Sequence, residues 1–191
     1  MESKSELRKK LLQARKAHVA ALPESMRALL FHRPPAPLLE LVPPGAAIGL
    51  YRANAHEAPA QSYAKFFQEA GHAIALPRFV DRASAMAFAA HSDPFEESDC
   101  EAGPFGLPQP MASAEDIVPQ VLFVPLVGFT ATGERLGQGG GHYDRWLADH
   151  PETIAIGLAW DSQLVDALPT EQHDVPLTAI VTPTRFYGPF A

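Results

Sequence analysis

The sequence contains one run, QVLFVPLVGF at residues 120–129, in which apolar and β-branched residues follow one another without polar alternation. Strands that are buried on both faces have this composition, whereas a strand with one exposed face alternates between apolar and polar residues. Residues 120–129 are therefore predicted to form a central strand of a parallel sheet. Such a sheet needs helices that cover both of its faces.

Shorter apolar segments alternate with amphipathic segments along the rest of the chain. Strands that alternate with helices predict an α/β protein, a three-layer α/β/α fold with a mostly parallel sheet and helices on both faces. The 191 residues, 47% of them hydrophobic, suffice for one core, so residues 1–191 are expected to form a single domain. The predicted strands are residues 46–51, 73–77, 85–91, 153–160 and 178–182, and the predicted helices are an N-terminal helix, residues 59–71, the segment that ends at 150 and residues 162–168.

Two segments are expected to lack regular structure. Residues 34–44 (PPAPLLELVPP) contain so many prolines that they predict a stiff connector. Residues 92–114 are rich in Asp, Pro and Gly without clear periodicity, which predicts a long loop. Loops of this length often carry binding residues.

Charge and composition exclude several classes of protein. The net charge of −7 opposes general binding to nucleic acid, which usually needs a basic surface. No apolar run approaches the roughly 18 residues of a membrane span, and the first ten residues are charged. We therefore expect a cytoplasmic monomer or homodimer with no membrane and no nucleic-acid partner. The single cysteine, Cys100, lies in an acidic segment that does not predict a reactive thiol, and the spacing of the histidines does not predict a zinc site.

Basic residues gather at the start of this acidic chain, where six of the 15 fall within the first sixteen positions. In a helix, Lys4, Arg8 and Arg15 would share one narrow face. One interpretation is a solvated basic face, and the other is a binding site for an anion.

A glycine-rich run, RLGQGGGHYDR at residues 135–145, follows the predicted central strand. Ligands of open α/β sheets bind beyond the carboxyl ends of the strands. Glycines permit positive φ and let backbone N–H groups approach an anion, and a following helix N-terminus adds partial positive charge. The run lacks both the Walker pattern and the dinucleotide pattern. It predicts either a phosphate cradle or a tight connection from strand to helix.

Charged residues within and beside this run favour the cradle. Arg135 and Arg145 offer forked donors to phosphate oxygens. Asp144 is able to hold a magnesium ion that bridges phosphates, although an acid in the first turn of a helix also complements the helix dipole.

The longer run VPLVGFTATGERLGQGGGHYDRWL closely resembles the signature of the 5-formyltetrahydrofolate cyclo-ligase family, also called the 5,10-methenyltetrahydrofolate synthetases. The resemblance covers nearly the whole chain. Further segments resemble the other blocks of that family in the same order: KSELRKKLLQAR, YRANAHEAPAQSYAKFF, AIALPR, FGLPQP and IGLAWDSQLVDALPTEQHDVPLTAIVT. The chain departs from the family pattern at four positions. Gln109 stands where the family has glutamate, and Thr130 stands where it often has aspartate. Gln138 stands where an aromatic or basic residue is common, and His142 stands where tyrosine is usual.

This resemblance implies a ligase that forms a C–N bond. The implied reaction converts 5-formyltetrahydrofolate and ATP, with Mg²⁺, to 5,10-methenyltetrahydrofolate, ADP and phosphate. A formamide oxygen is a poor leaving group, so phosphorylation of that oxygen would allow attack by the neighbouring N10 amine. Phosphoryl transfer asks the protein mainly for positioning and charge stabilisation.

The resemblance also implies a role for particular residues. The implied ATP-binding residues are Lys4, Arg8, Arg135, Gly137, Gly139, Gly140, Gly141 and Tyr143, and two of them, Arg135 and Tyr143, would also be catalytic. The implied folate-binding residues are Glu57, Gln138 and His142. The implied ligands of Mg²⁺ are Asp144 and Asp174. Simpler interpretations stay open for three of them. Glu57 would otherwise be a helix-entry acid, Asp174 a turn residue, and His142 a packing substitute for tyrosine.

Two other functions stay open. The departures at Gln109, Thr130, Gln138 and His142 permit a catalytically inactive protein that binds folate or nucleotide on the same scaffold. A sugar-phosphate isomerase or acyl hydrolase of similar architecture would use the cradle for a substrate phosphate and would work without ATP.

Overall fold

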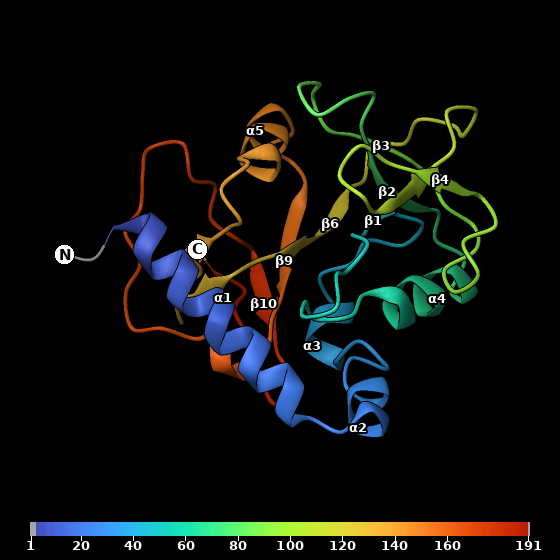
Figure 1. Ribbon diagram of the computed structural model, residues 1–191. Helices are drawn as coiled ribbons and strands as arrows, with labels where there is room; N and C mark the ends of the chain where they lie inside the picture. The colour runs from blue at the N-terminus through green and yellow to red at the C-terminus, as the bar shows by residue number, and fades with distance from the viewer. Residues whose placement is uncertain (1–2, 191) are drawn as a thin grey trace.

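The computed structural model describes residues 3–190, and a seven-stranded sheet forms its centre (Figure 1). The strands of this sheet are β1 (Ile48–Gly49), β2 (Ile74–Arg78), β3 (Ala87–Ala90), β6 (Val121–Pro125), β9 (Ile154–Leu158), β10 (Ala179–Val181) and β11 (Phe186–Tyr187). Their order is β11-β10-β9-β6-β1-β2-β3. The five inner strands pair in parallel, and both edge strands pair antiparallel. The predicted mostly parallel sheet is confirmed.

Helices lie on both faces of the sheet, as the sequence predicted. The helical segments are α1 (Lys4–Ala21), α2 (Glu24–Leu29), α3 (Ala36–Leu39), α4 (Gln61–Glu69), α5 (His142–Asp149) and the 3₁₀ turn η1 (Asp161–Gln163). A capping box between Ser3 and Glu6 starts α1, because the two side chains bond each other's backbone N–H. Gly141, with φ of 65°, starts α5.

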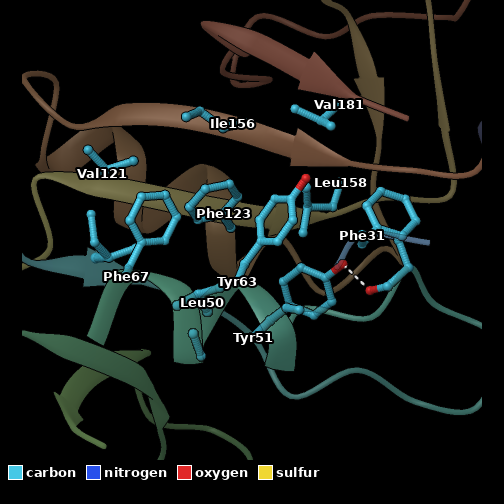
Figure 2. Close-up of a cluster of buried hydrophobic side chains, with 14 of the residues drawn as sticks. Phe31, Leu50, Tyr51, Tyr63, Phe67, Val121, Phe123, Ile156, Leu158 and Val181 are labelled. Carbon is cyan, nitrogen blue, oxygen red and sulfur yellow. Dashed lines mark hydrogen bonds between the residues drawn. The ribbon is translucent and has the colours of Figure 1, made fainter. Parts of the chain in front are cut away.

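The central strand β6 is buried on both faces. Val121 and Phe123 pack into the cluster under α4, where Tyr63 and Phe67 contact Phe123 ring to ring (Figure 2). The next residues along β6 point the other way, because side chains alternate along a strand, and they join the cluster under α5 with Trp146. This two-sided burial explains the unbroken apolar composition of the strand.

The predicted central strand is shorter than the apolar run. It ends at Pro125, and the chain forms a small separate hairpin from β7 (Gly128–Phe129) and β8 (Arg135–Leu136). The carbonyl groups of Leu126 and Val127 leave the sheet there and accept hydrogen bonds from the side-chain amide of Gln163.

Three other predictions of secondary structure are wrong in part. The proline-rich connector 34–44 contains α3, which proline permits because its fixed φ suits the first turn of a helix. The long loop 92–114 contains a hairpin of β4 (Cys100–Ala102) and β5 (Pro108–Pro110). The predicted helix 162–168 is only the short turn η1, because Leu164 is extended and bridges Phe129 of β7. The edge strand β11 and the helix α2 were not predicted.

The strand order places a topological switch point between β1 and β6. The chain leads from β1 to β2 on one side and from β6 to β9 and β10 on the other. The loops after β1 and β6 therefore turn away from each other and open a crevice at the carboxyl ends of the two strands.

We expect Phe123→Ala to lower the free energy of unfolding by about 3–5 kcal/mol, because the ring is fully buried between strand and helix and its loss leaves a cavity. Denaturant unfolding followed by circular dichroism measures this change. Val80→Ala is the control, since Val80 is 92% exposed and its truncation should cost less than about 0.5 kcal/mol. Equal losses for the two variants would contradict the central role of β6.

Candidate functional site

A cavity of about 560 Å³ lies at this switch point. It is lined by Tyr51, Pro77 and Pro125, which lie at or near the carboxyl ends of β1, β2 and β6. The glycine-rich loop, the start of α1 and the β4–β5 hairpin supply the walls. Every residue to which the resemblance assigned a role lines this cavity: Lys4, Arg8, Glu57, Arg135, Gly137, Gln138, Gly139, Gly140, Gly141, His142, Tyr143, Asp144 and Asp174.

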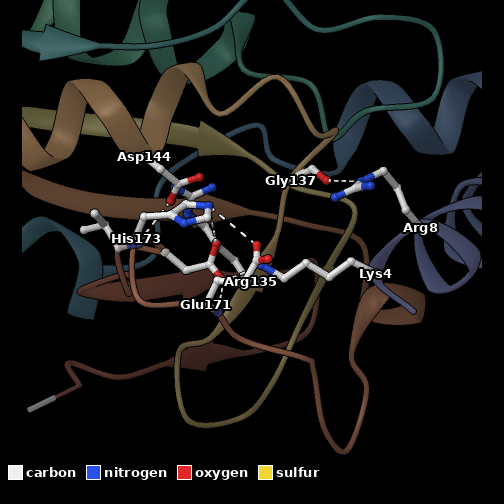
Figure 3. Close-up of polar contacts among 9 residues, drawn as sticks. Lys4, Arg8, Arg135, Gly137, Asp144, Glu171 and His173 are labelled. Carbon is white, nitrogen blue, oxygen red and sulfur yellow. Dashed lines mark hydrogen bonds and ion pairs between the residues drawn. The ribbon is translucent and has the colours of Figure 1, made fainter. Parts of the chain in front are cut away.

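Arg135 is the buried cation of the site. Only 8% of the residue is exposed, and its Nη2 donates to Oδ1 of Asp144 at 2.6 Å (Figure 3). Asp144 lies in the first turn of α5 and also accepts the N–H of Val175 at 3.1 Å. Burial lowers the pKa of Arg135, and the negative charge of Asp144 opposes that shift. The Nε of Arg135 is buried without a hydrogen-bond partner.

The glycine-rich loop folds closely around arginine side chains. Nε of Arg8 donates to the carbonyl of Gly137 at 2.8 Å (Figure 3). Gly139 has φ of 102°, and a Cβ there would lie 3.3 Å from the Arg8 guanidinium carbon. At Gly141, with φ of 65°, a Cβ would lie 2.8 Å from Nη1 of Arg145. The left-handed backbone at these two positions favours glycine, because other residues are strained there.

Lys4 extends from the first turn of α1 to the rim of the cavity. Its Nζ lies 2.6 Å from Oδ2 of Asp174 and 2.7 Å from Oε2 of Glu171. Partial burial opposes both charges, but these hydrogen bonds and charges raise the pKa of Lys4 and lower that of Asp174. Ligand atoms of Glu171, His173 and Asp174 lie within 4.8 Å of one another, so this rim carries a group able to hold a cation.

Glu57 is the buried carboxylate of the opposite wall, 7% exposed. Its Oε2 accepts the backbone N–H of Asn54 at 2.8 Å, and its Oε1 accepts the side-chain amide of Gln138. Burial raises the pKa of Glu57, while the Asn54 bond, the charge of Arg15 and the Gln138 bond oppose the shift. Gln138, one departure from the family pattern, therefore connects the glycine-rich loop to this acid.

His142 belongs to an aromatic group at the mouth of the cavity. Its ring lies 5.0 Å from that of Phe79 and 5.6 Å from that of Phe105, both edge to face. Burial and the positive charge of Arg145 lower the pKa of His142, which favours the neutral ring.

The Gln109 side chain makes two hydrogen bonds with the backbone of Phe79. It accepts the N–H of Phe79 at 3.1 Å and donates to the carbonyl of Phe79 at 2.9 Å. A glutamate could not make both of these bonds, because a carboxylate only accepts.

Tyr143 lines the cavity, and burial raises the pKa of its hydroxyl well above the ordinary value. It is therefore a neutral hydrogen-bonding group at physiological pH.

Thr130 does not line the cavity. Its hydroxyl bonds Glu134 in the turn between β7 and β8. The departure from the family pattern at Thr130 is thus a feature of that turn.

Sequence patterns missed several lining residues. Phe79, Phe105 and Leu107 lie in segments without periodicity, and Tyr51 and Arg52 follow a strand of only two residues. A useful signal was present, because the family-like segments AIALPR and FGLPQP directly adjoin Phe79 and contain Phe105.

The fold and the cavity define an α/β protein with a glycine-rich loop at the switch point of a mostly parallel sheet. A family model described as the 5-formyltetrahydrofolate cyclo-ligase family matches residues 1–183. The chain therefore belongs to this family, and the resemblance noted from the sequence is confirmed. The enzyme class that the sequence predicted, a ligase that forms a C–N bond, is the class that the family name identifies.

Individual relatives agree with the family model. A Mycolicibacterium smegmatis protein named 5-formyltetrahydrofolate cyclo-ligase is 31% identical over 96% of this chain and 95% of that protein. An Escherichia coli K12 protein of the same name is 45% identical over 41% of this chain, so the chain aligns with only about half, 47%, of that relative's length. The NMR structure of an Aquifex aeolicus 5,10-methenyltetrahydrofolate synthetase has a TM-score of 0.75 and 26% identity, and the match covers 97% of this chain and 92% of that one.

None of the helices within residues 3–190 is both long and apolar enough to cross a membrane.

We expect Glu57 to titrate above 4.5, its ordinary value, and Asp174 to titrate below 3.8. Because folding raises the pKa of Glu57, the folded state binds this proton more tightly than the unfolded state. The extra stability of the folded state is fully present below the pKa that Glu57 has in the unfolded chain. It is lost as pH rises through the pKa that Glu57 has in the folded state. NMR of the side-chain carboxyl carbons measures both midpoints, and a Glu57 midpoint at or below 4.5 would contradict its burial in the cavity wall.

Proposed function

We propose that this chain catalyses the ATP- and Mg²⁺-dependent cyclisation of 5-formyltetrahydrofolate to 5,10-methenyltetrahydrofolate, with release of ADP and phosphate. One observation carries the proposal: a buried arginine beside a glycine-rich loop shares a cavity with a buried carboxylate on the opposite wall. The first arrangement suits phosphate groups, and the second suits a ligand with N–H donors. A pterin ring has such donors.

The chemistry explains why both arrangements are needed. The formyl oxygen becomes a leaving group when it receives the γ-phosphoryl group. N10 then attacks the formyl carbon, the C–N bond forms, N10 loses its proton, and the C–O bond breaks as phosphate leaves. The protein must hold the formyl oxygen in line with the transferred group and stabilise negative charge there.

The phosphate side of the cavity fits this role. Nε of Arg135 is a buried donor without a protein partner, which suits a ligand oxygen. Backbone N–H groups of residues 137–141 and the first turn of α5 add partial positive charge. Lys4 and Arg8 line the same cavity from α1 and would hold the outer phosphates. This role explains a basic helix face in a chain whose net charge is −7.

Asp144 and Asp174 are the proposed ligands of Mg²⁺. Both carboxylates line the cavity, and carboxylates beside phosphate oxygens are the usual environment of this ion. Their present partners are the cations Arg135 and Lys4. When bound, Mg²⁺ neutralises phosphate charge. The carboxylates would then orient the polyphosphate relative to Arg135.

Glu57, Gln138 and His142 are the proposed folate-binding residues. The Glu57 carboxylate would accept N–H groups of the pterin, and Gln138 would hold the acid toward the cavity. The neutral His142 ring, with Phe79 and Phe105, offers an apolar edge for the rest of the substrate. Half-buried Tyr143 lines the same cavity and would donate a hydrogen bond near the reacting oxygen.

The proposal is tested by mixing the protein with 5-formyltetrahydrofolate and following the absorbance of methenyltetrahydrofolate with and without Mg-ATP. Product that depends on Mg-ATP supports the proposal. Folate binding without product would instead identify an inactive binding protein. Family membership already disfavours the sugar-phosphate isomerase and the acyl hydrolase. We propose that the enzyme works in the cytoplasm as a monomer or homodimer.

We expect Arg135→Ala to lower turnover at least about a hundredfold, the scale of losing one preorganised charge donor. The reason is that Arg135 is a buried guanidinium in the cavity wall whose Nε has no protein partner and would bind a phosphate oxygen. Initial rates at saturating substrate measure the effect.

Arg185→Ala is the matched control for this variant, because Arg185 is exposed in the turn after β10 and does not line the cavity. Its turnover should equal that of the wild type. Wild-type turnover in Arg135→Ala would remove this residue from the mechanism.

We expect Asp144→Asn to raise the Mg²⁺ concentration needed for half-maximal activity by about 10–100-fold, the range for weakened metal sites. A Mg²⁺ titration at fixed ATP measures the shift. Asp149→Asn, at the exposed end of the same helix, is the control. An unchanged titration in Asp144→Asn would favour the simpler interpretation that Asp144 complements the helix dipole.

A further inference from the structure

A second cluster of metal-ligating side chains lies outside the cavity. His91 directly follows β3, Asp99 directly precedes β4, and Cys100 is the first residue of β4. None of the three lines the cavity of the proposed active site. His91 is 6% exposed, and the other two are half-buried.

The ligand atoms of the three side chains converge. Nδ1 of His91 lies 3.1 Å from Oδ1 of Asp99 and 3.7 Å from Sγ of Cys100. Sγ of Cys100 lies 3.8 Å from the same Oδ1. The three atoms therefore form a triangle with sides of 3.1, 3.7 and 3.8 Å.

A tetrahedral zinc ion requires almost this triangle. Bonds of about 2.3 Å to sulfur and about 2.0–2.1 Å to nitrogen and oxygen place the ligand atoms roughly 3.3–3.6 Å apart at tetrahedral angles. We propose that His91, Asp99 and Cys100 bind one Zn²⁺ ion, with the fourth position left to water. This inference goes beyond the proposed ligase activity and does not depend on it.

The surroundings of the cluster suit a dication. The second oxygen of Asp99 accepts the backbone N–H of Ser92 at 2.6 Å and its hydroxyl at 3.3 Å, which orients the carboxylate as outer-shell partners do in metal sites. The carboxylate of Asp99 places a negative charge directly at the cluster, and this charge attracts a metal ion. Metal binding would displace the thiol proton of Cys100, because the thiolate is the form that binds metal.

The position of the cluster gives the ion a structural consequence. It would join the end of β3 to the start of β4 and close the loop 92–98 between them. The β4–β5 hairpin contains Gly103, Phe105 and Gln109, and these three residues line the active-site cavity. Zinc would therefore hold the hairpin that carries this wall.

Co²⁺ is the probe for this site, because a cobalt ion bound to a thiolate has a charge-transfer band in the near ultraviolet. The chain has one cysteine, so any such band reports Cys100. We expect the intact protein to develop the band, to saturate at one equivalent of Co²⁺, and to lose the band when Zn²⁺ is added. Absence of the band with stoichiometric Co²⁺ would overturn the proposal.

Variants separate the cluster from a lone thiol. His91→Gln and Asp99→Asn should each weaken Co²⁺ binding by more than about tenfold. His32→Gln, at an exposed position outside both groups of metal-ligating side chains, should leave it unchanged and serves as the control. Equal affinity in His91→Gln and the wild type would overturn the three-ligand site. X-ray absorption of the zinc-loaded wild type, which needs no variant, should show one sulfur ligand, and a spectrum without sulfur would also overturn it.

Discussion

The burial of β6 on both faces is the constraint on which the rest of this structure depends. Val121 and Phe123 contribute to one core, while Leu122 and Val124 contribute to the other. Such a strand must lie in the interior of a parallel sheet between two helical layers. Because β1 pairs with it in parallel and the chain leaves the two strands in opposite directions, a crevice at their carboxyl ends follows from the topology.

The end of β6 is equally important for the site. Beyond Pro125 the carbonyls of Leu126 and Val127 leave the sheet, and buried carbonyls need donors. Gln163 and the buried Arg15 provide them for Leu126, from η1 and α1 respectively. Arg15 thus shares a helix face with Lys4 and Arg8 but serves a different purpose. It fixes α1 against the strand end, which brings the other two cations to the glycine-rich loop.

The sequence predicted what depends on periodicity and on unusual composition. The double-sided β6, the helix α4 and the glycine-rich loop each have a strong local pattern, and each was found. The β4–β5 hairpin has strands of only three residues each, which is too short for alternation of apolar and polar residues to identify them. The turn η1 replaces a helix because tertiary hydrogen bonds of Gln163 outweigh the local apolar pattern. In the site, the family-like segments located Glu57 and Asp174, but the aromatic group of Phe79 and Phe105 depends on contacts between distant loops.

The cations of the cavity already have partners in the protein. Lys4 is paired with Asp174, Arg135 with Asp144, and Arg8 with the carbonyl of Gly137. A buried charge without a partner would be costly, so each pairing offsets part of the cost of placing a charge in the cavity wall. On the proposed function, a bare polyphosphate would have to displace two carboxylates and leave them beside its own negative charge. A polyphosphate that arrives with Mg²⁺ brings the cation that those carboxylates need. If the proposed function holds, the pairing of acids with bases around the glycine-rich loop is therefore a physical reason for the site to prefer a nucleotide in its magnesium complex.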